Sequence, residues 1–266
     1  MLRQLGVTTT IITATCAFAQ TNIIGPHEYP QFRTLSGLSG GGFGVRPDGT
    51  PAFDGAMALS TPIGYSLGHW NGTLTASNTS DYWFFRLPHI TGYEGKDDSI
   101  GKFSGCGGVT LGHFGSLCGS FMVVSSQWDT EFNLQYQAPL FYKNVGISAG
   151  VQDTAGTRYD RATGLPGRRS SQSWFSAATV PLKCGVYVSG GWGTRRFDKG
   201  FANVSVPIGD RFKAIVEEDG LGVNEMVAWN PKAVESYKLF GRAITTTMML
   251  GFIDSRYAVW SLNFGM

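Results

Sequence analysis

Apolar and polar residues alternate with a period of two along much of this sequence, and this pattern restricts the fold more than any other feature. In the stretch 130–138, Asn133, Gln135 and Gln137 occupy every second position. The positions between them hold Phe132, Leu134, Tyr136 and Ala138. Because successive side chains of a β-strand point to opposite faces, this spacing predicts a strand with one polar and one apolar face.

The same alternation recurs along the chain, and turn residues such as Gly209-Asp210 and Asp219-Gly220 separate the stretches. Neither a helical periodicity nor an apolar run long enough for a helical membrane span is present. About 12 or 13 strands are therefore expected. They fall at 53–61, 63–76, 100–113, 116–125, 130–138, 144–153, 171–180, 184–194, 202–206, 211–219, 222–230, 242–252 and 257–266.

Composition and strand spacing favour a membrane barrel. The chain has 37 glycines, 13% aromatic residues and only 15% charged residues, which suits short strands, turns and aromatic girdles. A membrane strand needs about 9–11 residues, so two strands with their loops take roughly 40 residues. We predict an all-β fold, an antiparallel up-and-down membrane β-barrel of about 12 strands, with Asn133, Gln135 and Gln137 facing the lumen and Phe132, Leu134 and Tyr136 facing lipid.

A soluble β-sandwich with its apolar face turned inward would give the same alternation. Three features favour the barrel instead. The N-terminus resembles an export signal, and the last stretch, 257–266, alternates to the chain end with Phe264 two residues before it. Many regular strands without a helix also allow the sheet to close, as lipid requires because an unpaired backbone group there costs several kcal/mol.

The export signal covers residues 1–19. Arg3 supplies the positive region, an apolar stretch follows, and Ala17-Phe18-Ala19 forms an A-x-A cleavage site. Cleavage before Gln20 would leave residues 20–266 as a single β-barrel domain with a short N-terminal extended segment. We expect this domain to be inserted in the bacterial outer membrane. A lipid attached to Cys16 is the alternative form of processing.

One proposed strand and its two successors carry charges that would be costly in lipid, roughly 2–4 kcal/mol for an Arg or Lys at the midplane. We therefore expect this charged face to line the lumen. The strand 211–219 contributes Arg211, Lys213, Glu217 and Asp219, and the next two strands offer Glu225 and Arg242 as partners. The charges either fill a closed barrel through salt bridges or form a polar track for sugar hydroxyls or small ions.

Motifs of catalysis, metal binding and cofactor binding are missing from the sequence. After leader removal three cysteines remain, without a C-x-x-C pair, and the four histidines are scattered. Cys106 and Cys118 would lie across a hairpin, and their pairing is left open. The glycine-rich stretch Ser39–Gly44 lacks the Lys-Ser/Thr of a phosphate-binding loop, so we expect a turn or a glycine-flexible strand there. We expect neither an enzyme nor a bound metal or cofactor, and a net charge of +2 argues against nucleic-acid binding.

Four segments, in order, resemble the YjbH-like outer-membrane proteins. They are Pro47–Thr50 (PDGT), Val145–Thr157, Gly190–Phe197 (GGWGTRRF) and Arg211–Pro231. Val216-Glu217-Glu218 stands where the family has an aromatic residue after glutamate, and the chain is shorter than typical members. The resemblance implies an outer-membrane barrel that is accessory to exopolysaccharide production, with no catalytic residues.

The function expected from these features is an accessory role in exopolysaccharide export or envelope structure. Outer-membrane lipid is the expected partner, together with polysaccharide or proteins of the export machinery. The alternative is a secreted soluble β-sandwich whose tryptophans stack on carbohydrate. A third hypothesis, a barrel hydrolase, lacks a Ser/His/acid set.

Overall fold

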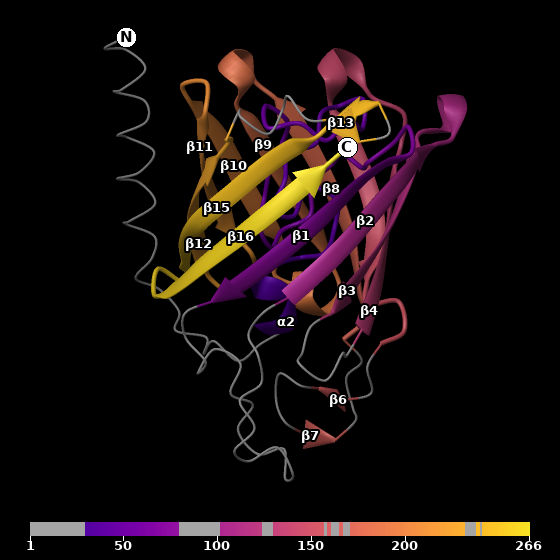
Figure 1. The fold of residues 1–266 in the computed structure, drawn as a ribbon. Coiled ribbons are helices and arrows are strands. Elements are labelled where there is room, and N and C mark those ends of the chain that lie inside the picture. The colour runs from indigo at the N-terminus through magenta and orange to yellow at the C-terminus, as the bar shows by residue number, and fades with distance from the viewer. Residues whose placement is uncertain are drawn as a thin grey trace.

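The computed structural model of this chain is a closed β-barrel of 12 antiparallel strands (Figure 1). It describes residues 30–79, 102–123, 130–156, 159–160, 165–166, 171–231, 238–239 and 241–266. The barrel strands are β1 (Asn71–Thr79), β2 (Lys102–Thr110), β3 (Ser116–Val123), β4 (Thr130–Gln137), β5 (Gly146–Gln152), β8 (Ser173–Pro181), β9 (Tyr187–Gly193), β10 (Phe201–Ile208), β11 (Phe212–Glu218), β12 (Val223–Trp229), β15 (Thr245–Ile253) and β16 (Tyr257–Gly265).

Strands that follow one another in the barrel wall are neighbours, and β1 closes the sheet by pairing with both β2 and β16. The prediction of an antiparallel barrel of about 12 strands is therefore confirmed. Two small hairpins lie outside the barrel sheet: β6 (Tyr159–Asp160) with β7 (Leu165–Pro166), and β13 (Lys238–Leu239) with β14 (Arg242–Ala243). The predicted leader, residues 1–19, lies outside the described residues.

The two ends of the barrel differ in their connections. At the turn end, uppermost in Figure 1, the chain turns through 111–115, 138–145, 182–186 and 209–211, and β16 ends there. At the opposite end, called the loop end, lie the segments 153–156 and 171–172 and the connections 194–200, 219–222 and 254–256. The short helix α2 (Pro30–Arg33) also lies at the loop end.

The predicted alternation holds along β4. Phe132, Leu134 and Tyr136 are exposed on the outer wall, whereas Asn133, Gln135 and Gln137 are buried inside the barrel. In the ladders with β3 and β5, outward Leu134 lies opposite Gly119 and Val151.

The lumen is occupied by the chain that precedes β1. Residues 32–68, called the plug, are buried almost throughout, and Figure 1 shows their indigo trace inside the barrel. The predicted strand at 53–61 is therefore wrong, and the one at 63–76 begins only at Asn71. Isolated bridges join Val45 to Pro51 and Ala56, but the plug has no continuous ladder.

Candidate functional site

The plug has an irregular backbone, and its N–H and C=O groups need partners because buried, unpaired backbone groups are costly. Some of these groups pair within the plug, as Val45 and Ala56 do. Others are paired by side chains on the lumen face of the barrel. The polar residues that alternate along the strands therefore bind the plug.

Glutamines of β4 illustrate this role. The Gln135 side-chain nitrogen donates to the carbonyl oxygens of Ile63 and Tyr65 at 2.9 and 3.0 Å, and its oxygen accepts from the Ser39 N–H at 3.2 Å. Gln137 accepts from the Ser66 N–H at 2.7 Å. Each amide side chain supplies both a donor and an acceptor, so it can pair both kinds of backbone group.

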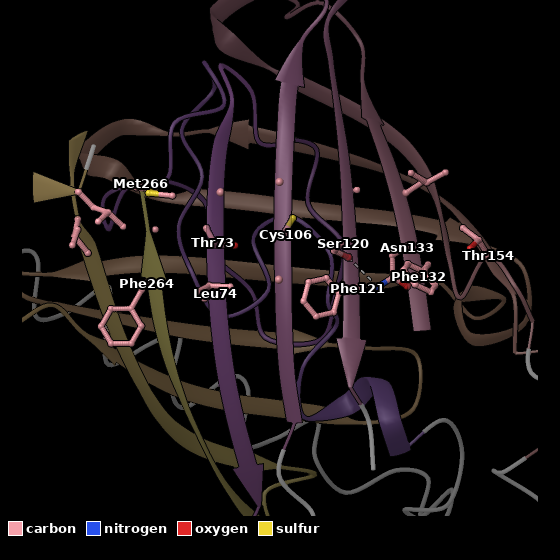
Figure 2. Close-up of a pocket in the computed structure, with 18 residues that line it drawn as sticks. Thr73, Leu74, Cys106, Ser120, Phe121, Phe132, Asn133, Thr154, Phe264 and Met266 are labelled. Carbon is pink, nitrogen blue, oxygen red and sulfur yellow. Dashed lines mark hydrogen bonds between the residues drawn. The ribbon is translucent and has the colours of Figure 1, made fainter. Parts of the chain in front are cut away.

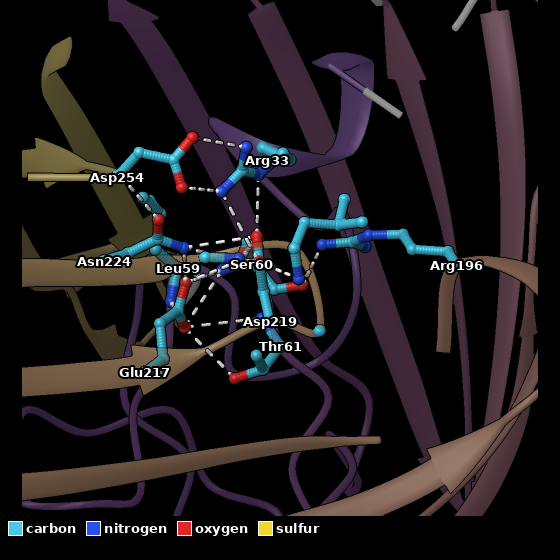
Figure 3. Close-up of polar contacts among 12 residues, drawn as sticks. Arg33, Leu59, Ser60, Thr61, Arg196, Glu217, Asp219, Asn224 and Asp254 are labelled. Carbon is cyan, nitrogen blue, oxygen red and sulfur yellow. Dashed lines mark hydrogen bonds and ion pairs between the residues drawn. The ribbon is translucent and has the colours of Figure 1, made fainter. Parts of the chain in front are cut away.

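Glu217 holds the middle of the plug (Figure 3). Its carboxylate accepts from the N–H of Leu59 at 3.0 Å and from the N–H and hydroxyl of Ser60 at 2.9 and 2.6 Å. The Thr61 hydroxyl and the Asn224 side-chain amide also donate to it, at 3.1 and 3.0 Å. None of these named donors carries a positive charge. Several neutral hydrogen-bond donors therefore stabilise the carboxylate.

Arg33, at the end of α2, fastens the start of the plug to two turns of the loop end. Its guanidinium forms a two-pronged pair with Asp254, at 2.8 and 2.5 Å, and a 2.9 Å contact with Asp219 (Figure 3). The Asp219 carboxylate also accepts from the N–H groups of Leu221 and Gly222 in its own turn. Arg33 and Asp219 are fully buried, so the pair is shielded from water.

The pairing governs the ionisation of both groups. Burial acts to raise the pKa of Asp219, but the charges of Arg33 and Arg196 and hydrogen bonds from Arg33 and Leu221 outweigh it and hold the pKa below 3.8. For Arg33, burial acts to lower the pKa, and the charge of Asp219 together with the bonds to Asp254 raises it above its usual value. Both groups therefore stay charged in the neutral range.

Two further cations reach the plug, Lys213 from β11 and Arg196 from the connection 194–200. The Lys213 ammonium donates to the Gly55 carbonyl oxygen at 2.5 Å. Arg196 donates to Gln152 and to the Ser60 carbonyl oxygen, each at 2.7 Å, and its guanidinium lies 5.6 Å from the centre of the Phe32 ring. Carbonyl oxygens of the plug are thus bound by charged donors.

The structure divides the six residues expected to line the lumen. Lys213, Glu217 and Asp219 are buried inside the barrel, where they contact the plug. Arg211 is exposed in the turn 209–211, before β11 begins. Lys213, Glu217 and Asp219 therefore bind the plug, whereas the sequence led us to expect salt bridges among the charged residues themselves.

The expectation for Glu225 and Arg242 is wrong. Glu225 pairs with Val216 on the outer face, because Glu217 lies directly opposite Asn224 and this register turns the even-numbered residues of β12 inward. Arg242 belongs to the β13–β14 hairpin, where it donates to the carbonyl oxygens of His69 and Trp70 at the turn end.

Sequence reasoning did not identify Arg33 or Arg196 as interior residues. Arg33 lies in the segment expected to be merely extended, and no local pattern links it to turns about two hundred residues away. Arg196 belongs to the segment Gly190–Phe197 that was singled out by resemblance. Its fully buried position comes from the connection 194–200, which folds back toward the lumen.

The wall opposite the plug contains glycines that leave room for it. A Cβ atom on Gly108 would lie 2.1 Å from the Leu67 carbonyl oxygen, and one on Gly146 would lie 2.4 Å from the Tyr65 ring. Contacts below 3.0 Å are not tolerated by real Cβ atoms. The plug therefore packs directly on the backbone of the wall.

The outer wall has the opposite character, since its exposed side chains are largely apolar. Aromatic residues gather near both ends, and aliphatic residues such as Leu74, Leu134 and Leu250 lie between them. Exposed aromatic residues toward the turn end are Trp70, Phe114, Tyr136, Phe141, Tyr142, Phe212, Trp229 and Phe264. Those toward the loop end are Phe103, Phe121, Phe132, Trp174, Trp192 and Phe252, and Trp260 lies nearer the middle of β16.

Figure 2 shows an apolar groove of about 870 Å³ on this outer wall. Gly105, Gly107 and Gly119 form part of its floor because they place no side chain on the outer face, and Leu74 and Phe121 stand beside them. A second hollow, of about 710 Å³, lies at the turn end and includes the exposed ion pair of Arg46 with Asp54.

Within the described residues, no group of His, Cys, Asp and Glu is arranged to hold a metal ion. Over the same part of the chain, no helix has the length and apolar character needed to cross a membrane. No protein-family model matches the sequence, and no curated protein is significantly similar to it.

Proposed function

We propose that this protein is an outer-membrane β-barrel closed by its own plug, and that it serves the envelope as a structural or export accessory. The observation that carries the membrane location is the apolar outer wall with aromatic residues near both ends. Monomeric soluble proteins rarely expose a continuous apolar surface of this kind, whereas a membrane barrel requires it. The alternative of a β-sandwich is excluded because the sheet closes on itself.

The contacts of the plug support a closed lumen. Glu217, Arg196 and Lys213 would be available to ions or sugars in an open barrel, but here each binds backbone groups of the plug. Of the two roles considered for the charged face, these contacts favour the structural one. The protein would therefore act through its surfaces and its plug, and its resting state would conduct few ions.

The narrower role in exopolysaccharide export rests on the resemblance to the YjbH-like family. Two of the resembling segments have constrained conformations. The turn at Pro47–Thr50 is closed by a bond from the Arg46 N–H to the Thr50 carbonyl oxygen, and Gly49 has a φ of 84°. Asp153, in the second segment, has a φ of 55° and accepts from the Gly156 N–H. Such positions depend on particular residues, so a shared motif there is informative.

Cell fractionation tests the membrane location. The protein is expected to resist carbonate extraction, to require detergent for solubility, and to migrate differently on gels before and after boiling. Recovery in the soluble fraction without detergent would reject the proposal. The export role is tested separately by deleting the gene: surface polysaccharide should fall and return on complementation, and an unchanged amount would leave only the envelope-structural role.

A further inference from the structure

Cys106 and Cys118 face each other inside the barrel. They lie on the neighbouring strands β2 and β3, and the register pairs Cys106 with Ser120 and Cys118 with Gly108, so both point to the lumen side as diagonal neighbours. Diagonal neighbours are ordinarily about 7–8 Å apart, beyond the reach of small side chains. Here the two Sγ atoms are only 2.8 Å apart, because both side chains turn toward each other.

We propose that Cys106 and Cys118 form a disulfide bond that staples the β2–β3 hairpin in the exported protein. An ordinary disulfide has an S–S distance of about 2.05 Å, so the two sulfur atoms need to approach by less than about 1 Å to form the bond. Cysteines that serve only as small apolar residues need not point at each other. The third described cysteine, Cys184, is exposed in the turn 182–186 and has no such neighbour within that turn.

The reaction is a thiol–disulfide exchange with a disulfide-bearing oxidant of the exporting compartment, such as an oxidoreductase or oxidised glutathione. The thiolate of one cysteine attacks the oxidant's disulfide and forms a mixed disulfide. The second thiolate then displaces the oxidant's sulfur. The two cysteines lose two protons and two electrons, and the oxidant's disulfide is reduced to two thiols.

The plug covers this cysteine pair. Both cysteines are buried in a cluster with apolar plug residues that include Phe43, Tyr65 and Leu67, and Leu67 also packs on the backbone of Gly108 beside them. An oxidant cannot reach thiols in this position. The bond is therefore formed before the plug takes its place, and the seated plug protects it from reductants.

Mass mapping of alkylated protein tests the bond. Protein isolated from cells is denatured without reductant, treated with iodoacetamide and digested with trypsin; residues 103–142 contain no Lys or Arg, so both cysteines fall in one peptide, 103–143. We expect this peptide to be unalkylated and lighter by two hydrogens, while Cys184 is alkylated. In the Cys118→Ser control, Cys106 should become alkylated. Alkylation of both Cys106 and Cys118 in the wild-type protein would overturn the proposal.

This result is independent of the membrane location, because a linked peptide can be found in a soluble or an extracted protein. A second measurement addresses protection by the plug. Incubation of the folded protein with a phosphine reductant should leave peptide 103–143 linked, and the same reductant in denaturant should open it. Equal reduction in both conditions would overturn the claim that the plug seals the bond.

Discussion

Glu217 gives the plug more hydrogen bonds than any other single carboxylate described above, so its loss has a predictable cost. Glu217→Ala removes the acceptor for the N–H groups of Leu59 and Ser60, and each buried donor left unpaired costs about 1–3 kcal/mol. We expect the free energy of unfolding to fall by roughly 2–5 kcal/mol. Unfolding in urea measures this change, with the heat-dependent shift in gel mobility used to distinguish folded from unfolded protein.

The matched control is Glu218→Ala, since Glu218 is the next residue and lies exposed on the outer side of β11. Surface substitutions of this kind usually change stability by about 0.5 kcal/mol or less, and the loss of one bond to the Gly220 N–H adds little. Equal effects of the two substitutions would contradict the docking role assigned to Glu217.

Gly108 and Gly107 are adjacent residues that point to opposite faces, and together they test whether the plug is needed for closure. A valine at 108 would collide with the Leu67 backbone, whereas Gly107 has no atom within 4 Å of an added Cβ. We expect Gly108→Val to displace the plug and raise the ion conductance of the protein in planar bilayers, with Gly107→Val unchanged. If both variants conduct as little as the wild type, steric exclusion of the plug is not what these glycines prevent.

Among the secondary-structure elements, α2 is fastened to the barrel by a contact that depends on pH. Because the pKa of Asp219 is depressed by Arg33 in the folded protein, this pair adds stability that is fully present above the ordinary value of 3.8. That stability is lost as the pH falls below this value toward the lower folded-state pKa. We expect acidification below about pH 4 to loosen the plug, observed as rising conductance or cleavage of the plug by pepsin.

Substitutions separate this contact from general acid effects. Asp219→Asn removes one of the two charge partners of Arg33, so the plug should be loosened already at neutral pH and should respond less to acid. Asp54→Asn, in the exposed pair with Arg46 at the turn end, should leave the acid response unchanged. An identical acid response in the wild type and in both variants would show that Asp219 is not responsible.

At the scale of strands, the sequence predicts the existence of each strand more reliably than its register against the neighbouring strand. The alternation of Phe132, Leu134 and Tyr136 is sufficient to predict a strand at this place, because side chains along a strand alternate with a period of two. The prediction that Glu225 faces the lumen is wrong, because the turn 219–222 places Glu217 opposite Asn224 and so turns Glu225 to the outer face. A shift of one residue exchanges the faces, so the face depends on a turn geometry that alternation does not specify.

The position of the plug inside the barrel could not be predicted from periodicity, for a different reason. Its residues alternate locally, as in the predicted strand 53–61. Their backbone groups pair partly with other plug residues and partly with side chains of the wall, and they form no continuous ladder with a neighbouring strand. Gly40 and Gly42 have positive φ values of 88° and 86°, which agree with a turn, the first of the two structures expected at Ser39–Gly44. That this turn lies inside the barrel depends on long-range contacts such as the one between Ser39 and Gln135.

In the whole molecule, the two faces of the barrel wall have separate tasks. The inner face binds an irregular segment of chain and therefore needs amides, hydroxyls and charges. The outer face carries few charges and exposes apolar residues such as Leu134 and Leu250, which are poorly solvated by water. The proposed membrane would surround these residues with lipid. The depth of a residue in that membrane should then determine how much free energy a charge placed there costs.

Leu250 lies near the middle of β15 and is 66% exposed, whereas Leu182 lies in a connection at the turn end and is 50% exposed. An arginine near the bilayer midplane costs about 2–4 kcal/mol, and one near the interface about 0–1 kcal/mol. Leu250→Arg should therefore lower the free energy of unfolding in phospholipid vesicles far more than Leu182→Arg. In a barrel surrounded by water, both arginines would be hydrated and the two variants would be equally stable. Equal stabilities in vesicles, measured by urea unfolding, would thus reject the membrane location even though the barrel itself is closed.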